Sequence, residues 1–178
     1  MNYEYYIHYW EVVDGDTIRI LLDKGFEETK WISCRLLGVD APETQYLSQR
    51  KAALRVKEVA LKWLLEAEGV LYRSWSEVSR GYRYPLWEDE PFSCISKLKY
   101  VSLGHKKDKY GRRLGNICES DNKAYDLNTG NLLNVGNTLS EYLLKSKLVK
   151  PYKKGPRGWT KQELEDIYHI AGSILDNS

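Results

Sequence analysis

Side chains that could perform hydrolytic chemistry gather in residues 34–44, which read Cys-Arg-Leu-Leu-Gly-Val-Asp-Ala-Pro-Glu-Thr. Arg35 stands in an apolar, strand-like run, so its charge must reach water or meet an anion, because burying it unpaired is costly. Asp40 and Glu43 flank Pro42, which fixes its own φ and stiffens the turn. Carboxylate and carbonyl oxygens on such a corner suit a hard cation such as Ca2+. A metal beside an arginine and a base is an arrangement suited to phosphodiester hydrolysis.

Two other stretches carry the same residue types, namely residues 13–17 (Val-Asp-Gly-Asp-Thr) and 108–113 (Asp-Lys-Tyr-Gly-Arg-Arg). In-line displacement at a phosphodiester builds negative charge on the equatorial oxygens, and planar arginines stabilise that charge bidentately. Taken singly, each stretch also has a purely structural interpretation. The first is a common turn sequence, Arg35 could form a structural salt bridge, and the third could be a solvated turn.

Bulk composition sets modest bounds on function. The chain has 178 residues, 20.8 kDa and a formal net charge of +2, which fits one domain with a sizeable core and favours no particular partner. Local charge is more one-sided: residues 145–161 are basic without an acid, and residues 97–113 nearly so. Such tracts suit a polyanion, or they form a solvated surface. Cys34, Cys94 and Cys118 match neither a disulfide framework nor a zinc pattern, and we interpret them as reduced core thiols.

The start of the chain lacks the basic residues and continuous apolar segment of a signal peptide, and no apolar run approaches the length of a membrane span. We therefore expect a cytoplasmic monomer that binds no membrane. The three histidines, His8, His105 and His169, lie apart and have no metal-ligand spacing.

Aromatic and β-branched runs predict five strands. Residues 6–13, 18–22 and 31–37 read as a meander with Gly-containing turns. Residues 99–101 and 114–118 predict two further strands that follow a long irregular stretch.

Three helices follow from apolar spacing and from capping residues. Apolar residues at helical spacing predict a helix over 53–67 with Gly69 as its stop. Two capping boxes, Thr138 with Glu141 and Thr160 with Glu163, begin a helix over 139–147 and a terminal helix.

Together these elements predict an α+β fold, with a five-stranded antiparallel OB-fold β-barrel, three α-helices and an inserted loop or hairpin region. We expect one domain over residues 1–178, with the insertion at about residues 72–98. Aromatic and arginine side chains alternate in that insertion, where they either stack on bases or form a satellite core under a long loop.

In this order, residues 13–17, 35–44 and 108–112 resemble the three signature blocks of the staphylococcal (thermonuclease-like) nuclease family. The helices that follow also match that family's layout, so the resemblance covers most of the chain. It implies an OB-fold, Ca2+-dependent phosphodiesterase that acts on DNA and RNA, favours single-stranded or frayed substrate, and leaves 3′-phosphate ends. The segment between the first helix and Asp108 is longer than the family pattern, which puts substrate reach in doubt.

The resemblance also implies a role for each matching residue. Asp16 and Asp40 would ligate Ca2+ through their carboxylates, Ala41 would do so through its carbonyl, and Glu43 would act as general base. Arg35 and Arg112 would clamp the phosphate, Lys109 and Tyr110 would line the nucleotide pocket, and Tyr152 would lie against the base or terminal phosphate. We expect neither Arg35 nor Glu43 to belong to the core. The alternative is a non-catalytic OB-fold module that binds nucleic acid or peptide.

Overall fold

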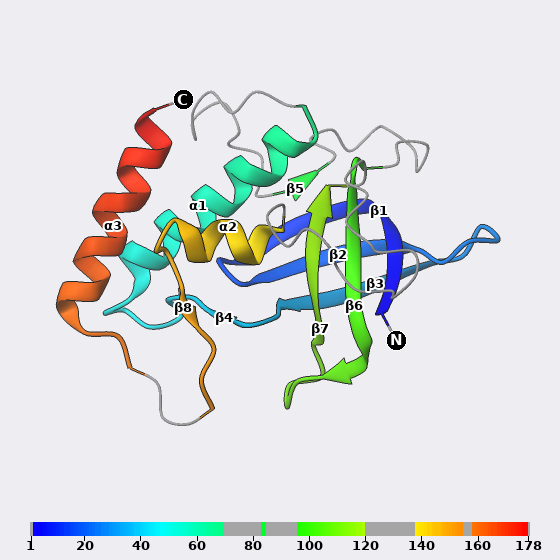
Figure 1. Cartoon of the computed structure of the whole chain (residues 1–178), viewed down its shortest axis with the longest axis horizontal. Helices are drawn as coiled ribbons and strands as arrows, with labels where there is room; N and C mark the ends of the chain where they lie inside the picture. The colour runs from blue at the N-terminus through cyan, green and yellow to red at the C-terminus, as the bar shows by residue number, and fades with distance from the viewer. Residues whose placement is uncertain (1, 70–82, 85–95, 120–137, 155–157, 178) are drawn as a thin grey trace.

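The structure is a computed structural model that describes residues 2–69, 83–84, 96–119, 138–154 and 158–177 (Figure 1). Its elements, in chain order, are β1 (Asn2–Asp14), β2 (Thr17–Asp23), β3 (Thr29–Leu36), β4 (Val39–Asp40), α1 (Arg50–Ala67), β5 (Arg83–Tyr84), β6 (Leu98–Lys107), β7 (Arg113–Glu119), α2 (Leu139–Lys145), β8 (Lys150–Pro151) and α3 (Lys161–Asp176).

Five strands close into a barrel. The sheet runs β2-β3-β7-β6-β1, and β1 pairs with β2 to complete the ring. The predicted α+β architecture, an OB-fold-like barrel with three helices, is confirmed. The expectation of antiparallel pairing throughout is wrong, because β3 and β7 run parallel, with Cys34 opposite Arg113. The reason is geometric: strand directions cannot alternate all the way around a closed ring with an odd number of strands.

β1 pairs with two other barrel strands along different parts of its length, which explains why it is longer than the predicted strand over 6–13. Its first part pairs with β6, from Asn2 opposite Leu103 to Tyr6 opposite Lys99. Its second part pairs with β2, ending with Asp14 opposite Thr17. The two-residue strand β5 pairs with β1 at its outer edge.

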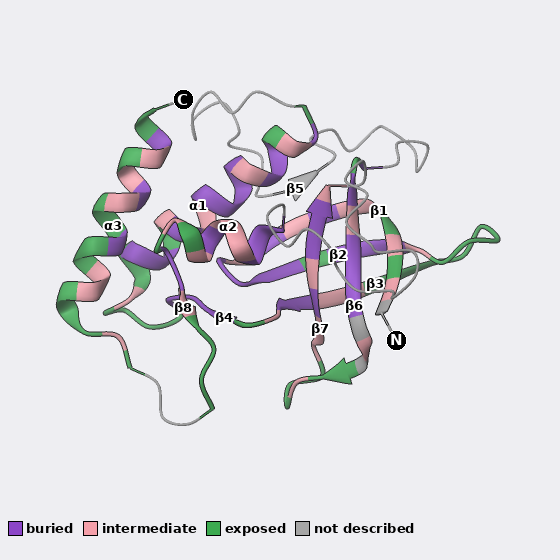
Figure 2. Ribbon diagram, in the orientation of Figure 1, coloured by how far each residue is buried: buried purple, intermediate pink, exposed green. Residues whose placement is uncertain are grey.

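The core fills the barrel and continues beneath α1 (Figure 2). The buried stripe of α1 includes Val56, Ala60 and Leu64, the spacing that predicts this helix, although α1 begins three residues earlier, at Arg50. α3 packs against α1, and Lys62 Nζ donates to the carbonyl of Ile174 at 2.8 Å. Within the described residues no helix has the length and apolarity to cross a membrane.

Glu68, just after α1, is a buried anchor for the chain that enters β6. Its carboxylate accepts hydrogen bonds from Trp10 Nε1 at 3.1 Å, from the Ser96 hydroxyl, and from the Lys97 backbone N–H at 2.9 Å. The end of α1, strand β1 and the start of β6 are thereby tied at one point.

The two predicted capping boxes differ. At α3, Thr160 Oγ1 accepts from the Glu163 N–H at 3.2 Å and the Glu163 carboxylate accepts from the Thr160 N–H at 2.8 Å, so this box is confirmed. At α2, Thr138 accepts from the Glu141 N–H, but the Glu141 carboxylate pairs with Lys145 at 2.9 Å. The capping box at α2 is therefore only half formed. This helix ends at Lys145, two residues before the predicted end.

Cys34 and Cys118 are buried and form no disulfide, as expected of core thiols. Cys94 and most of the aromatic residues of the predicted insertion lie outside the described residues.

Candidate functional site

The turn between β1 and β2 places the first acidic residue of the site. Gly15 occupies this turn because a Cβ there would lie 2.5 Å from Val56 Cγ1 and 3.2 Å from Ala41 Cβ. The absence of a side chain lets the turn approach α1 and the corner after β3. Asp16 is therefore carried to the 40–41 corner, and its carboxylate accepts from the Ala41 N–H at 2.8 Å.

Arg35, on β3, meets two carboxylates at that corner. Its Nη1 lies 2.5 Å from Asp16 Oδ2 and its Nη2 lies 3.2 Å from Asp40 Oδ1. The anions that Arg35 requires are thus supplied by its own chain. Arg35 is only 7% exposed, so the expectation that it lies outside the core is wrong. The apolar residues around Arg35 in the sequence do place it inside the protein, and the ion pairs make that position tolerable.

The electrostatics of Asp16 favour an additional cation. Burial raises the pKa of the Asp16 carboxyl, and the nearby charge of Asp40 adds to that effect. Arg35 and the hydrogen bonds from Ala41 and Thr17 oppose the rise in pKa but do not cancel it. A carboxylate whose pKa is raised by burial is stabilised when it takes up a proton or when a metal ion binds to it.

The turn between β6 and β7 presents the second arginine. Asp108 Oδ1 accepts from the N–H groups of Tyr110 and Arg112, both at 2.9 Å, and its Oδ2 accepts from Arg112 Nε at 2.6 Å. Burial alone would raise the pKa of Asp108, but these hydrogen bonds and the charge of Arg112 lower it. The Arg112 side chain is fixed in this way, and its Nη1 donates to Thr17 Oγ1 at 3.2 Å.

Thr17 joins the two halves of the site. Its hydroxyl accepts from Arg112 and donates to Asp16 Oδ1 at 3.1 Å. Contacts therefore run without interruption from Arg112 through Thr17 and Asp16 to Arg35 and Asp40. Three stretches that are far apart in the sequence meet in one polar network, which is buried except at Arg112. We call the residues Asp16, Thr17, Arg35, Asp40 and Arg112 the site network.

Sequence reasoning missed the roles of Thr17 and Asp108. Thr17 follows Asp16 at a hairpin turn, where a short hydroxyl side chain can reach a neighbouring carboxylate. Asp108 is the lone acid of a basic tract and opens an Asx-type turn, which is a signal that it organises the residues after it.

Glu43 is half-buried and follows Asp40 by three residues, and its hydrogen bonds are made to two glutamines. Its backbone N–H donates to Gln49 Oε1 at 2.9 Å, and its carboxylate accepts from the side-chain amide of Gln45. Of the predicted catalytic residues, Arg35 and Arg112 are thus joined through Thr17 and Asp16, whereas the hydrogen bonds of Glu43 go to residues outside the site network.

The predicted substrate-binding residues surround the site network unevenly. The ring of Tyr110, which is 71% exposed, lies 5.3 Å from the Arg112 guanidinium and 4.9 Å from Lys109 Nζ. Tyr152 follows β8, which pairs with β4 at Asp40, and the Tyr152 N–H donates to the Gly38 carbonyl at 2.8 Å. Tyr110 therefore lies beside Arg112 of the network, and Tyr152 follows the strand that pairs with Asp40.

Asp16, Asp40 and Ala41 are the residues that could hold a hard cation at this corner. Within the described ranges no group of three or more His, Cys, Asp or Glu side chains could hold a metal ion. Asp16 and Asp40 nevertheless converge on one guanidinium, and Ala41 belongs to the same corner. Carboxylate and carbonyl oxygens are the ligand types that Ca2+ takes, and water would have to complete such a shell.

The positive charge of the basic tract at 145–161 is partly balanced by acidic residues in the folded structure. Lys145, Lys150 and Lys161 pair with Glu141, Glu163 and Glu165, which lie on α2 and α3. Three of the cations in this tract therefore face acids of the chain itself.

Comparison of the chain with protein-family models gives no match, and a search of curated proteins gives none either. The site network and the barrel that positions it are therefore the features that bear on function.

Proposed function

We propose that this protein is a Ca2+-dependent nuclease of the staphylococcal type, which hydrolyses phosphodiester bonds of DNA or RNA endonucleolytically and leaves 3′-phosphate ends. The observation that carries the proposal is the continuous path of contacts from Arg112 to Asp40. It supports a site where acids and guanidinium groups from three stretches act on one phosphate.

The two arginines would stabilise charge on the phosphate. A bound Ca2+ would supply Lewis acidity and would neutralise Asp16 and Asp40. Arg35 would then no longer be the main counter-charge of those carboxylates, and its guanidinium could turn a donor edge to a phosphate oxygen. Arg112, held by Asp108, would donate to a second oxygen from the opposite side. Both arginines would bind most strongly when negative charge on the phosphorus oxygens is greatest.

Glu43 would take the proton of the attacking water. A general base needs hydrogen-bond reach to that water, and contacts that are absent without substrate commonly form when substrate binds. The Glu43 carboxylate is held by the exposed side chain of Gln45. Exchanging that hydrogen bond for one to water costs about 1 kcal/mol, which is small beside the catalytic gain.

The test is cleavage of denatured DNA and of RNA with Ca2+, and again with chelator. We expect cleavage only with Ca2+, products with 3′-phosphate ends, and a loss of about 10²-fold to 10³-fold in Glu43→Gln. Glu165→Gln, an exposed acid on α3, is the matched control and should leave the rate unchanged. Full activity in Glu43→Gln would remove Glu43 from the mechanism, and absence of cleavage with every divalent ion tested would reject the nuclease.

The second candidate is a non-catalytic OB-fold module that binds nucleic acid or peptide. It is favoured by one observation: Arg35 is fully engaged by carboxylates of its own chain. Nucleic-acid binding that persists without cleavage under all divalent ions would identify this module.

A further inference from the structure

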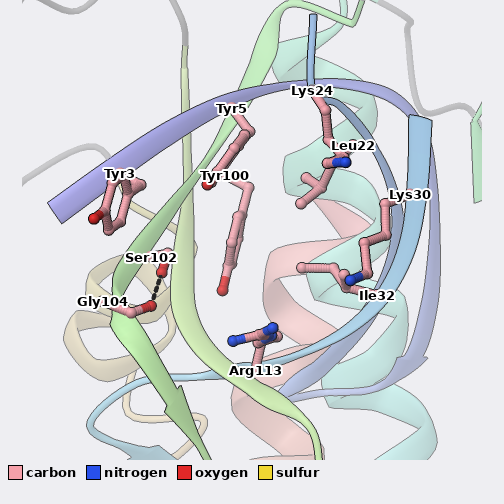
Figure 3. A pocket seen from close by; sticks show the side chains of 10 residues that line it. All are labelled: Tyr3, Tyr5, Leu22, Lys24, Lys30, Ile32, Tyr100, Ser102, Gly104 and Arg113. Atoms are coloured by element: carbon pink, nitrogen blue, oxygen red, sulfur yellow. Dashed lines mark hydrogen bonds between the residues drawn. The ribbon is translucent and has the colours of Figure 1, made fainter. Parts of the chain in front are cut away.

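The outer face of strands β2 and β3 continues from the site network toward the far end of the barrel. Figure 3 shows which side chains of these strands point inward: Leu22 and Ile32 line a cavity of about 130 Å³ at that end, together with residues of β1, β6 and β7. Side chains alternate along a strand, so the odd-numbered residues of β2 and β3 point outward. Thr17 and Arg35 of the site network therefore begin this outer face.

The register of the two strands arranges the outer face in rows. From the site network outward, the paired residues are Thr17 with Arg35, Arg19 with Ser33, and Leu21 with Trp31. The third row is four residues from the first, which is about 13 Å along an extended strand. The two nucleosides of a dinucleotide directly flank its phosphate, so a dinucleotide held at the site network stays close to the first row. A longer single strand can reach Trp31.

Trp31 is an exposed aromatic side chain at the end of this path. Its ring lies 5.1 Å from the ring of Tyr9 in a T-shaped arrangement. Leu21, which is opposite both Tyr9 and Trp31 in the register, is only 3% exposed. Trp31 is nevertheless 45% exposed. Exposed aromatic rings of this kind are the surfaces on which bases stack in proteins that bind single strands.

Arg19 lies in the row between the site network and Trp31. Its guanidinium is 4.6 Å from the centre of the Trp31 ring, and its Nη1 is 4.0 Å from Glu11 Oε2. The side chains of Arg19 and Glu11 are 55% and 41% exposed, so both contacts of the guanidinium are solvated and weak. A phosphate offers Arg19 a stronger, charge-assisted partner. When Arg19 turns to that phosphate, it uncovers the face of the Trp31 ring that it otherwise covers.

From these observations we propose that the outer face of β2 and β3 is a subsite for single-stranded nucleic acid, in which Arg19 binds a phosphate and Trp31 stacks on a base. The strand runs from the site network past Arg19 to Trp31. The proposal rests on the proposed function for the position of the scissile phosphate. It adds a preference for substrates that are longer than a dinucleotide.

The experiment compares single-stranded octathymidylate with the thymidine dinucleotide. Binding of octathymidylate is measured by calorimetry in the presence of chelator, which keeps the proposed hydrolysis silent, and kcat and KM of both substrates are measured with Ca2+. We expect Trp31→Ala to weaken octathymidylate binding by about tenfold or more, in line with the loss of one base–aromatic stack. Its KM for octathymidylate should rise by a similar factor, whereas its kcat and its KM for the dinucleotide should stay unchanged.

Arg19→Gln tests the phosphate contact. Each phosphate contact to a single strand contributes about −0.7 to the slope of log affinity against log salt, so this variant should have a slope that is shallower by about 0.7. A purely structural role of Arg19 would not change the slope. Tyr168→Ala is the matched control, because Tyr168 also has an arginine, Arg55, 5.2 Å from the centre of its ring but lies on α3. This variant should bind octathymidylate like the wild type.

The subsite and the proposed nuclease fail in different ways. Absence of cleavage of both substrates with every divalent ion would reject the nuclease, and weaker binding of octathymidylate in Trp31→Ala would still support the binding face. Unchanged affinity in Trp31→Ala or an unchanged salt slope in Arg19→Gln would overturn the subsite. An equal rise in KM for the dinucleotide and for octathymidylate would also overturn it. Because Arg19 is exposed, Arg19→Gln keeps the test decisive even if Trp31→Ala fails to fold.

Discussion

Replacing Arg35 by methionine should strongly destabilise the protein at neutral pH. Methionine fills most of the aliphatic volume of arginine but leaves Asp16 and Asp40 without their shared counter-charge, and these residues are 5% and 9% exposed. Removing one partner of a buried ion pair typically costs about 3–5 kcal/mol, because an uncompensated charge stays inside the protein. We therefore expect the free energy of unfolding in urea at pH 7 to fall by about that amount.

The loss should depend on pH in a predictable direction. Burial already raises the pKa of Asp16 in the wild type, and Arg35 opposes that rise, so its removal raises the pKa of Asp16 further. An acid whose pKa is higher in the folded state stabilises the fold when protonated, and this stability is lost as pH rises through the folded-state pKa. The Arg35→Met variant should therefore regain stability as the pH is lowered from 7 toward the ordinary range of aspartate. Added Ca2+ should also stabilise this variant more than the wild type, because a ligand of the folded state raises its stability by mass action.

Arg19→Met is the matched control for this experiment. Arg19 is also an arginine on a barrel strand, but its side chain is 55% exposed and lies 4.0 Å from Glu11. Solvated ion pairs of this kind contribute at most about 1 kcal/mol. A cost for Arg35→Met no larger than that of Arg19→Met, or a cost that does not change with pH, would refute the electrostatic account of the site network.

Three further predictions concern other parts of the molecule. In Asp16→Asn the amide oxygen can still accept from Ala41 and Arg35, while the amide NH2 would donate to Thr17 Oγ1 in place of the present bond. We therefore expect an unfolding free energy at pH 7 that is no lower than in the wild type, with Ca2+-dependent cleavage reduced by about 10²-fold or more; a loss of more than about 2 kcal/mol in urea would contradict this. Burial raises the pKa of the Cys34 thiol to about 12, so peptide mapping after thiol labelling at pH 8 should find Cys34 modified only in unfolded protein. Deleting residues 80–91, which lie mostly outside the described ranges, should alter the ratio of DNA to RNA cleavage more than the rate on the better substrate; a large drop in melting temperature would instead assign them to the core.

The elements of the fold could be predicted from the sequence where the signal is local. Alternating β-branched and aromatic residues locate β2 and β3, and apolar residues at helical spacing locate α1. Thr160 and Glu163 mark the start of α3 because both halves of a capping box lie within one turn. These signals depend on residues that are close together along the chain.

Contacts between residues that are far apart in the sequence could not be predicted in this way. The parallel pairing of β3 with β7 follows from closing an odd number of strands, which no single strand sequence reveals. The three stretches of the site could be found by residue type, but not the contact between Arg35 and the two aspartates, because an arginine in an apolar run is equally compatible with an external anion. The cavity at the barrel end went unpredicted because its lining comes from five separate strands.

The hydrogen bonds of the Glu68 carboxylate bear on where the sequence of this protein could accept insertions. It holds Trp10, Ser96 and Lys97 together, so the polypeptide departs after Gly69 and comes back at one clamped position. The entropy of closing a flexible loop grows slowly, by about 0.6 kcal/mol for each doubling of its length. A flexible insert added at this junction would therefore begin and end at positions that Glu68 fixes, and lengthening it would cost little in closure entropy. The junction is thus a place where new recognition could be engineered without moving the elements that Glu68 ties together.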